Sequence, residues 1–391
     1  MNINIIFNSQ VSSLSMGGGD KIGIMLASRW RSKGANILFI GCDEGMEMVR
    51  RSNFGFKLRK VSFLKASKIG VVGAYFFRML HAILSPFPLE KKSVIYSSSD
   101  FLPDVIPAFR AKILEPNHIW IAGFYLRAKN PFTFETKLNI KTILYFLGQQ
   151  ISIFLMKKAA DLIFVLCNDD FKYLVKKGIS SRKIARIRGG IDLKEIENIN
   201  SGEDKIYDGC FVGRFHEQKG LPELIKVWHM VVENLPDAKL VIVGWGAKKW
   251  ELFIKREIER LGMKKNVILK GFVDGKEKFE IMKSSKLFLF PSNYESWGLV
   301  VLEALGCGLP VVSFDLSPLK QNFAKGILYI PLHDLSAFAQ QVIKLLEDKD
   351  AREKLSIGAH SEAKKFAWQS IGNETFDKIN SLYMRICYED K

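Results

Sequence analysis

Residues 288–315, FLFPSNYESWGLVVLEALGCGLPVVSFD, decide the fold class of this chain. The apolar run at 287–290 predicts a buried strand, and a proline, a serine and an asparagine then form a turn. An apolar helix is expected over 296–305, where glycines end it. A second buried strand follows at 311–314. The order strand, helix, strand indicates a βαβ unit with a right-handed crossover in a parallel sheet.

Two carboxylates stand in this otherwise apolar stretch, Glu295 before the helix and Glu303 two turns inside it. A charge on Glu303 requires a partner, because an unpaired ion in an apolar environment is costly. The backbone amides of Trp297, Gly298 and Leu299 would point out of the helix N-terminus, where an anion is favoured. An anion that carries hydroxyl groups, such as a sugar nucleotide, would satisfy both sets of groups.

The bulk composition indicates a two-domain globular protein with an anionic partner. A chain of 391 residues is too long for one ordinary core, and 48% hydrophobic with 25% charged residues is a globular composition. The net charge of +17 predicts binding to nucleic acid, acidic lipid or a phosphorylated substrate.

The cysteines and histidines give no sign of a disulfide framework or a metal site. Five cysteines are scattered without CxxC spacing, and six histidines lack ligand spacing. An odd, dispersed set of cysteines favours a reducing cytoplasm.

No signal peptide is expected, since the first seven residues have no basic region or cleavage site. The uncharged, largely apolar stretch 142–156 is shorter than the roughly 20 apolar residues that span a bilayer. If the chain meets a membrane, we expect it to lie on the surface.

The N-terminus has the pattern of a doubly wound domain. A strand at 3–7, a loop that ends in Gly17, Gly18 and Gly19, a helix from 21 to 32 and a strand at 37–40 follow in order. The glycines would let a ligand phosphate approach the backbone at the helix start. The alternative is that they only form a turn. A dinucleotide-binding dehydrogenase is disfavoured because the GxGxxG spacing is absent.

Residues 50–92 form a basic segment that contains a single acid, Glu90. Ten Lys or Arg residues are interleaved with aromatic side chains, among them Phe54, Phe63 and Phe76. This combination suits an anionic membrane interface or single-stranded nucleic acid. The remaining alternative is a solvated basic face over a packed helix. A helical run at 71–84 favours the membrane interpretation.

Strands and helices alternate along the whole chain, so both halves should contain mostly parallel sheets. We expect an acceptor-side domain over 1–193, a polar linker over 194–207 and a nucleotide-sugar domain over 208–366. A last helix over 367–391 should pack back on the first domain. Such domains bind ligands beyond the carboxyl ends of their strands, which predicts a cleft between the two.

In the second half an ordered set of motifs resembles a known family, the retaining GT-B glycosyltransferases, and specifically the large family 4 group. The motifs that carry the resemblance are Gly213-Arg214 with Lys219-Gly220, Val243-Gly244-x-Gly246, Gly271-Phe272-Val273, and Glu295-x7-Glu303 followed by Gly306-x-Gly308-x-Pro310-Val311. Each motif alone is weak, but the ordered set at these separations is specific. The resemblance implies the GT-B fold, with two Rossmann-like domains that face each other across a cleft.

The resemblance also implies roles for the reaction, in which a sugar leaves a nucleoside diphosphate. Arg214 and Lys219, with Glu295, would be catalytic: the two cations stabilise the leaving diphosphate, and Glu295 holds hydroxyls of the donor sugar. The amides of Gly298 and Leu299 would add donors at the diphosphate.

The remaining donor contacts follow from the same resemblance. Glu303 would accept hydrogen bonds from the ribose, and Phe272 and Val273 would line the base site. Gly213 belongs to the phosphate loop, and the first-domain glycines, Gly18 and Gly19, would approach the phosphates and sugar. The alternatives are that Arg214 and Lys219 are surface cations and that Glu303 is ion-paired within its own domain.

Two departures from the family pattern concern the donor. Many relatives carry a histidine after a first-domain strand, whereas here His118 stands before the strand, so it is a candidate by residue type alone. Leu316, Ser317 and Pro318 replace a family glycine pair, which leaves the identity of the sugar open.

The sequence therefore predicts a retaining hexosyltransferase on the cytoplasmic side of a membrane, peripheral to it. It would use a UDP- or GDP-sugar donor and a lipid-linked or saccharide acceptor. The resemblance implies no cofactor and no essential metal, and no Asp-x-Asp motif stands in the matching region. The alternatives are a GT-B nucleotide-sugar epimerase and a nucleic-acid-binding protein, although no nucleic-acid-binding signature is present.

Overall fold

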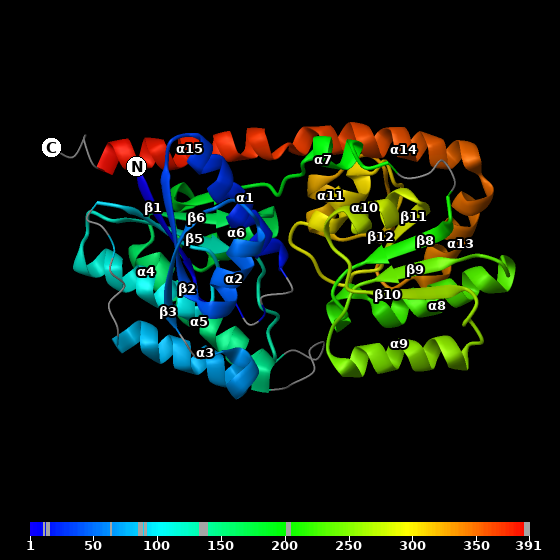
Figure 1. Cartoon of the computed structure of the whole chain (residues 1–391), viewed down its shortest axis with the longest axis horizontal. Helices are drawn as coiled ribbons and strands as arrows, with labels where there is room; N and C mark the ends of the chain where they lie inside the picture. The colour runs from blue at the N-terminus through cyan, green and yellow to red at the C-terminus, as the bar shows by residue number, and fades with distance from the viewer. Residues whose placement is uncertain are drawn as a thin grey trace. The chain divides into compact units, whose positions relative to one another are not determined.

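The computed structural model of the chain contains two compact units (Figure 1). One unit comprises Met1–Gly189 and Trp368–Lys391, and the other comprises Gly190–Ala367. The structure describes residues 1–10, 12, 16–62, 65–84, 89, 92–132, 140–200 and 205–386.

The first unit is built on a parallel sheet of seven strands in the order β3-β2-β1-β4-β5-β6-β7. Its central strands are buried on both faces, which explains their nearly continuous apolar sequences. The strands are β1 (Asn2–Phe7), β2 (Asn36–Cys42), β3 (Lys57–Ser62), β4 (Val94–Ser97), β5 (Ile119–Phe124), β6 (Leu162–Val165) and β7 (Ile184–Arg186).

Helices cover both faces of this sheet. Right-handed crossovers place α1 and α2 on one face and α3 to α6 on the other, because the chain changes direction along the sheet after β3. The helices are α1 (Gly18–Ser32), α2 (Asp43–Arg51), α3 (Ala66–Leu84), α4 (Leu102–Leu114), α5 (Ile140–Ala159), α6 (Asn168–Lys176) and α15 (Trp368–Met384).

The C-terminal helix α15 packs on α1. The indole Nε1 of Trp30 donates a hydrogen bond to Thr375 Oγ1 at 3.0 Å. A Cβ on Gly372 would lie 2.3 Å from Cβ of Arg29, so the two helices approach closely there. The first unit therefore includes the end of the chain.

The second unit is built on a parallel sheet of six strands in the order β10-β9-β8-β11-β12-β13. Its core surrounds the buried Trp228. The strands are β8 (Tyr207–Val212), β9 (Leu240–Val243), β10 (Val267–Gly271), β11 (Ser285–Phe290), β12 (Val311–Phe314) and β13 (Ile327–Ile330). The helices are α7 (Leu193–Glu197), α8 (Leu221–Asn234), α9 (Lys248–Arg260), α10 (Gly275–Lys283), α11 (Leu299–Gly306), α12 (Ser317–Asn322), α13 (Leu335–Glu347) and α14 (Lys349–Ala363), with a short 3₁₀ helix η2 (Glu217–Lys219).

The boundary of the units lies at Gly189, a few residues before the predicted one. Part of the predicted linker, 194–207, is helix α7 of the second unit, where Ile196 and Ile199 are buried. Ile191 also pairs with Ala367 at the other end of that unit. Residues 201–204 of the predicted linker lie outside the described residues.

Within the basic segment 50–92, the sequence missed the strand β3 and the beginning of helix α3. β3 is the edge strand of the first sheet and has the sequence KLRKVS, so its polar residues hide the apolar run that marks a buried strand. Phe63, Phe87, Glu90 and Lys91 of this segment lie outside the described residues. The long helix predicted from 132 begins at Ile140 as α5, and 133–139 are also outside the described residues.

Candidate functional site

The second sheet has a topological switch point between β8 and β11, where the strand order reverses. In open α/β sheets, ligands bind beyond the carboxyl ends of the strands at such a point. The loop after β8 carries Arg214 and Lys219, and the turn after β11 carries Glu295. The sequence-predicted catalytic residues therefore lie at the two strand ends where this fold binds ligands.

Lys219 and Glu295 meet directly. The Lys219 ammonium forms an ion pair and hydrogen bond with the Glu295 carboxylate, and both side chains are mostly buried. Ser292 Oγ donates to Glu295 Oε1 at 3.0 Å, and Lys219 Nζ lies 5.4 Å from the centroid of the Phe290 ring. These contacts fix a cation at the mouth of the switch point.

Two glycines hold the loop that carries Lys219 against the rest of the site. Gly220 has φ 67°, and a Cβ there would lie 1.7 Å from the Pro291 carbonyl oxygen. Gly244 has φ 146°, and its Cβ would lie 1.9 Å from the Gly213 oxygen. The glycines in the family motifs are therefore required for close backbone approach.

Arg214 is exposed to solvent in the same loop. Burial lowers the pKa of the His216 imidazole, and the positive charge of Arg214 lowers it further. His216 Nδ1 accepts a hydrogen bond from the Gln218 amide at 3.2 Å, which orders the loop between the two cations. The guanidinium is thus free to reach an anion in solvent at the switch point.

Helix α11 begins at Leu299, three residues later than predicted. The reason is Gly298, which has φ 90° and ψ 51°, outside the helical region. A Cβ on Gly298 would lie 2.5 Å from Leu319 Cδ2, so this position requires glycine. The first-turn amides of α11 open at the carboxyl edge of the sheet, as an anion site requires.

The side chain of Trp297 is a packing residue. It is buried, and its ring makes edge contacts with Phe323 and Phe366 at centroid distances of 5.8 and 5.7 Å. These contacts fix the segment before α11.

Glu303 is buried on α11 and has an ion-pair partner in its own unit. Lys278 Nζ of α10 lies 3.0 Å from Glu303 Oε2. Lys278 is also buried, and its Nζ lies 4.6 Å from the centroid of the Phe279 ring. The structure thus agrees with the alternative that Glu303 is ion-paired within its own domain. The predicted hydrogen bonds from the ribose to Glu303 stay a prediction.

Removal of Lys278 tests how strongly this pair stabilises the unit. Lys278→Ala leaves the carboxylate of Glu303 buried without its cation, and we expect a loss of about 3 kcal/mol in the free energy of unfolding. Lys276→Ala is the matched control on the same helix, since Lys276 pairs with Glu280 at the surface. We expect the control to lose less than about 1 kcal/mol in denaturant unfolding. Equal losses in the two variants would contradict the importance of the buried pair.

The predicted base-site residues follow β10. Phe272 is exposed (51%) and Val273 is half-buried. The Gly271 oxygen accepts a hydrogen bond from the Gly244 amide at 2.7 Å, so this segment lies beside the loop after β9. An exposed phenylalanine at the carboxyl edge of the sheet is available to stack on a base.

In the first unit, Gly18 and Gly19 form the first turn of α1, which begins three residues before the predicted start. A Cβ on Gly19 would lie 2.9 Å from Tyr125 Cδ2, so this glycine admits the tyrosine ring. The carboxylate of Asp20 already accepts a hydrogen bond from the Gly17 amide at 2.8 Å. An acid therefore occupies part of this helix N-terminus, and the predicted phosphate approach there stays a prediction.

The sequence missed a polar cluster at the switch point of the first sheet, between β1 and β4. The buried carboxylate of Asp104 accepts hydrogen bonds from the Asn8 amide at 2.7 Å, Ser9 Oγ at 2.9 Å and Ser99 Oγ at 2.5 Å. The local signal of this cluster in the sequence is the run of serines at 97–99, which has the composition of a helix cap. In fact the N-cap of α4 is Phe101, and it makes no side-chain cap hydrogen bond.

Burial raises the pKa of Asp104 from 3.8 to about 7, although hydrogen bonds from Ser99, Asn8 and Ser9 lower it. Because the folded pKa exceeds the unfolded one, ionisation of this group destabilises the fold as pH rises from about 4 to about 7. Asp104→Asn removes the ionisable group, so the variant should not lose this stability as the pH rises. We expect the melting temperature of the variant, relative to the parent, to increase between about pH 4 and about pH 7. A pH-independent difference between the two proteins would show that Asp104 does not titrate in this range.

His118 lies at the amino end of β5, on the opposite edge of the sheet from this switch point. Its Nδ1 lies 3.1 Å from Ser93 Oγ, and burial lowers its pKa. The structure does not bring His118 together with the other predicted site residues of the first unit.

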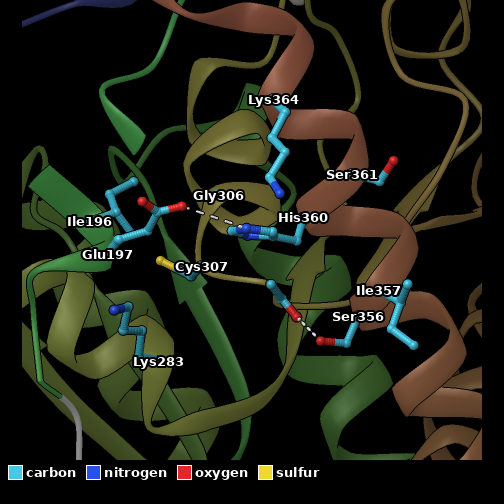
Figure 2. Close-up of a pocket in the computed structure, with 11 residues that line it drawn as sticks. Ile196, Glu197, Lys283, Gly306, Cys307, Ser356, Ile357, His360, Ser361 and Lys364 are labelled. Carbon is cyan, nitrogen blue, oxygen red and sulfur yellow. Dashed lines mark hydrogen bonds and ion pairs between the residues drawn. The ribbon is translucent and has the colours of Figure 1, made fainter. Parts of the chain in front are cut away.

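A cavity of about 640 Å³ lies elsewhere in the second unit, at the C-terminal end of α11 (Figure 2). Glu197, His360, Lys283 and Cys307 are among the residues that line it, and Glu197 Oε1 lies 3.6 Å from His360 Nε2. Burial raises the pKa of the Cys307 thiol to about 12, so it is not a nucleophile near neutral pH. Because this cavity is at the amino edge of β11, we place the donor site by topology and not by cavity size.

Among the described residues, no group of three histidine, cysteine or acidic side chains could hold a metal ion.

Comparison with known proteins finds similarity to glycosyltransferases. Residues 192–361 match the family model for glycosyl transferases group 1. Sulfoquinovosyl transferase SQD2 of Arabidopsis thaliana is 28% identical in an alignment of 242 residues that covers 56% of this chain and 45% of that protein. Poly(glycerol-phosphate) alpha-glucosyltransferase of Bacillus subtilis is 33% identical in an alignment of 185 residues that covers 46% of this chain and 27% of that protein. The chain thus spans less than half the length of these relatives.

Among solved structures, the Anabaena protein HepE in complex with UDP and glucose is similar over 97% of this chain and 100% of its own, with a TM-score of 0.74 at 15% identity. This similarity confirms the predicted GT-B fold class: two parallel, Rossmann-like sheets with flanking helices.

Proposed function

We propose, on the premise that this chain belongs to the glycosyl transferases group 1 through residues 192–361, that it transfers a hexose from a nucleoside-diphosphate sugar to an acceptor with retention of the anomeric configuration. The observation that carries the proposal is the meeting of Lys219 and Glu295 at the switch point, beside the first turn of α11.

The donor site combines groups of opposite charge, as a sugar nucleotide requires. Arg214 and Lys219 supply positive charge where the diphosphate becomes more negative as the bond to the anomeric carbon breaks. The N-terminus of α11 adds backbone donors at the same charge. The hydroxyl-binding groups are carboxylates: Glu295 for the sugar and Glu303 for the ribose. We assign the base to Phe272 and Val273 and the close phosphate approach to Gly213.

Catalysis in this proposal requires no metal, because two cations and a helix N-terminus balance the charge of the leaving group. This supports a UDP- or GDP-sugar as donor without a cofactor. UDP and glucose in the structurally similar HepE show that this fold accommodates such ligands in that protein.

We assign the acceptor to the first unit and propose that it is a lipid-linked or saccharide molecule. In the relative from Bacillus subtilis the acceptor in the name, poly(glycerol phosphate), is an anionic polymer. The net charge of +17 here suits a phosphate-bearing acceptor of this kind. The four described cysteines are free thiols, which supports a reaction on the cytoplasmic side.

A panel of UDP- and GDP-sugars tests the proposal. We expect at least one donor to raise the melting temperature and to release its nucleoside diphosphate slowly, even in excess EDTA. Conversion of the donor to an epimeric sugar nucleotide without release would support the epimerase instead, an alternative for which the comparisons give no support. Tight binding of oligonucleotides with no effect of any nucleotide sugar would contradict the transferase.

A further inference from the structure

Helix α3 of the first unit exposes apolar side chains and buries small or charged ones. The side chains that it buries against the unit are small or charged: Ala74, Arg78 and Ala82, spaced by four residues. Its large apolar side chains are exposed to solvent, and Leu80 and Leu84 are 54% and 77% exposed. Water-exposed surfaces of ordinary helices carry the opposite pattern.

Polar contacts hold α3 in this orientation. Arg78 Nη2 lies 2.7 Å from Glu44 Oε2, and the arginine is 1% exposed. The other oxygen of Glu44 accepts a hydrogen bond from the Ala66 amide at 2.6 Å, at the start of the helix. At the far end, Arg110 of α4 donates to the Ala82 and Ile83 oxygens at 3.0 and 2.6 Å.

These contacts bear on how α3 could meet a membrane. Among the described residues it is the helix that could cross a bilayer by length and composition, although Gly70, with φ 73° and ψ 165°, breaks it near its start. Crossing would separate Arg78 from Glu44 and bury its charge in hydrocarbon, at high cost. Lying flat keeps the ion pair and places the apolar side chains outward.

Helix α5 presents a matching apolar stripe. Its exposed Ile140, Leu147, Ile151 and Phe154 are separated by 7, 4 and 3 residues in turn, which places them on one face. On α3, after the break in the helix at Gly70, the exposed residues 76, 80 and 83 repeat the spacing of 147, 151 and 154. Both helices pack against α4 on the same face of the sheet. They also approach each other directly, since a Cβ on Gly148 would lie 3.0 Å from Tyr75 Oη.

The charges on these two helices have one sign. Neither α3 nor α5 contains an acidic residue. Lys68, Lys141, Lys157 and Lys158 are exposed on them. A second copy of this surface would bring like charges together, which disfavours a symmetric dimer. An anionic lipid bilayer offers both negative headgroups and an apolar interior.

We propose that α3 and α5 form the surface by which this chain docks on an anionic lipid bilayer, with α3 lying flat in the interface. The proposal deepens the proposed function, on which it rests only in assigning the bilayer as the place of the acceptor. The proposed membrane contact is therefore not the whole basic segment 50–92 but the apolar stripes of α3 and α5, which lysines flank.

Co-sedimentation of the full chain with phosphatidylcholine vesicles, with and without phosphatidylglycerol, tests this surface. We expect binding that phosphatidylglycerol strengthens and salt weakens. The double variant Leu80→Gln with Phe154→Gln should bind at least about tenfold more weakly, since two large apolar contacts are lost. Leu252→Gln with Ile357→Gln is the matched control, because these residues are equally exposed but lie in the second unit. The control should bind as the parent does.

A second pair of substitutions leaves the apolar stripes intact. Lys68→Glu with Lys158→Glu should weaken binding to the anionic vesicles while leaving binding to pure phosphatidylcholine nearly unchanged. Parent-like vesicle binding by both pairs of variants would overturn the proposal. So would a parent dimer that the Leu80 and Phe154 substitutions dissociate, because the surface would then be occupied by a second copy.

The nucleotide-sugar panel distinguishes this proposal from the proposed function. The docking variants should respond to UDP- or GDP-sugars as the parent does, because their substitutions lie in the first unit. Vesicle binding without any response to nucleotide sugars would leave the docking surface standing and contradict the transferase. A response to nucleotide sugars without vesicle binding would support the transferase and contradict the docking surface.

Discussion

Replacing Arg214 or Lys219 by alanine is expected to lower the rate of donor cleavage by about a hundredfold to a thousandfold, the range found when one donor to a developing anion is removed. Both cations follow β8 at the switch point. Their effect should appear mainly in kcat, since charge on the diphosphate is greatest in the transition state. Initial rates of nucleoside diphosphate release measure it.

Lys226→Ala is the matched control, because Lys226 is an exposed cation on α8 of the same unit. It should change the rate by less than about twofold, as surface charges act weakly. If Arg214→Ala and Lys219→Ala both retained the parent rate, the two residues would be surface cations and the assignment of the leaving-group site would be wrong.

Lys219 and Glu295 should act as a coupled pair. Removing either leaves the other mostly buried without its partner, so Glu295→Gln should also lower the rate. The double variant should be less damaged than the sum of the single effects predicts. Additive effects on the logarithm of the rate would indicate that the two residues bind separate parts of the donor independently.

The second large effect concerns Gly220. Gly220→Ala is expected to destabilise the second unit by at least about 3 kcal/mol, since it adds a steric clash to an unfavourable φ. The new Cβ would lie 1.7 Å from the Pro291 oxygen, and it can be accommodated only if the loop and the turn separate. That separation should also weaken binding of nucleoside diphosphate.

Gly262 provides a matched control for the backbone conformation. It has φ 69°, close to the 67° of Gly220, but a Cβ there would meet no atom within 4 Å. Gly262→Ala should therefore cost only about 1–2 kcal/mol, the price of the left-handed conformation. Denaturant unfolding of both variants separates the cost of the left-handed conformation from the cost of the clash with Pro291. Equal destabilisation would mean that the approach to Pro291 contributes nothing.

The sequence predicts most of the fold because buried parallel strands have apolar runs that are hard to mistake. β8, β9 and β12 all contain such runs. The edge strand β3 was missed because lysines and an arginine alternate with its apolar residues. The N-terminus of α11 was placed too early because only the backbone reveals that Gly298 has a positive φ.

The candidate site was predicted where the motifs are local and missed where partners are distant. Lys219 and Glu295 each belong to a short motif, and the topology brings them together across 76 residues. No local pattern links Asp104 to Asn8, which is 96 residues away. The sequence could equally not choose between the ribose and a lysine as the partner of Glu303, because Lys278 stands on another helix.

Calorimetric titration of UDP and GDP into the parent protein and Arg214→Ala tests most directly whether this switch point holds the nucleoside diphosphate of a sugar donor. We expect saturable binding of one of the two nucleotides to the parent without added metal, and at least about tenfold weaker binding to the variant. Failure of both nucleotides to bind the parent, or equal affinity for the parent and Arg214→Ala, would contradict the proposed donor site.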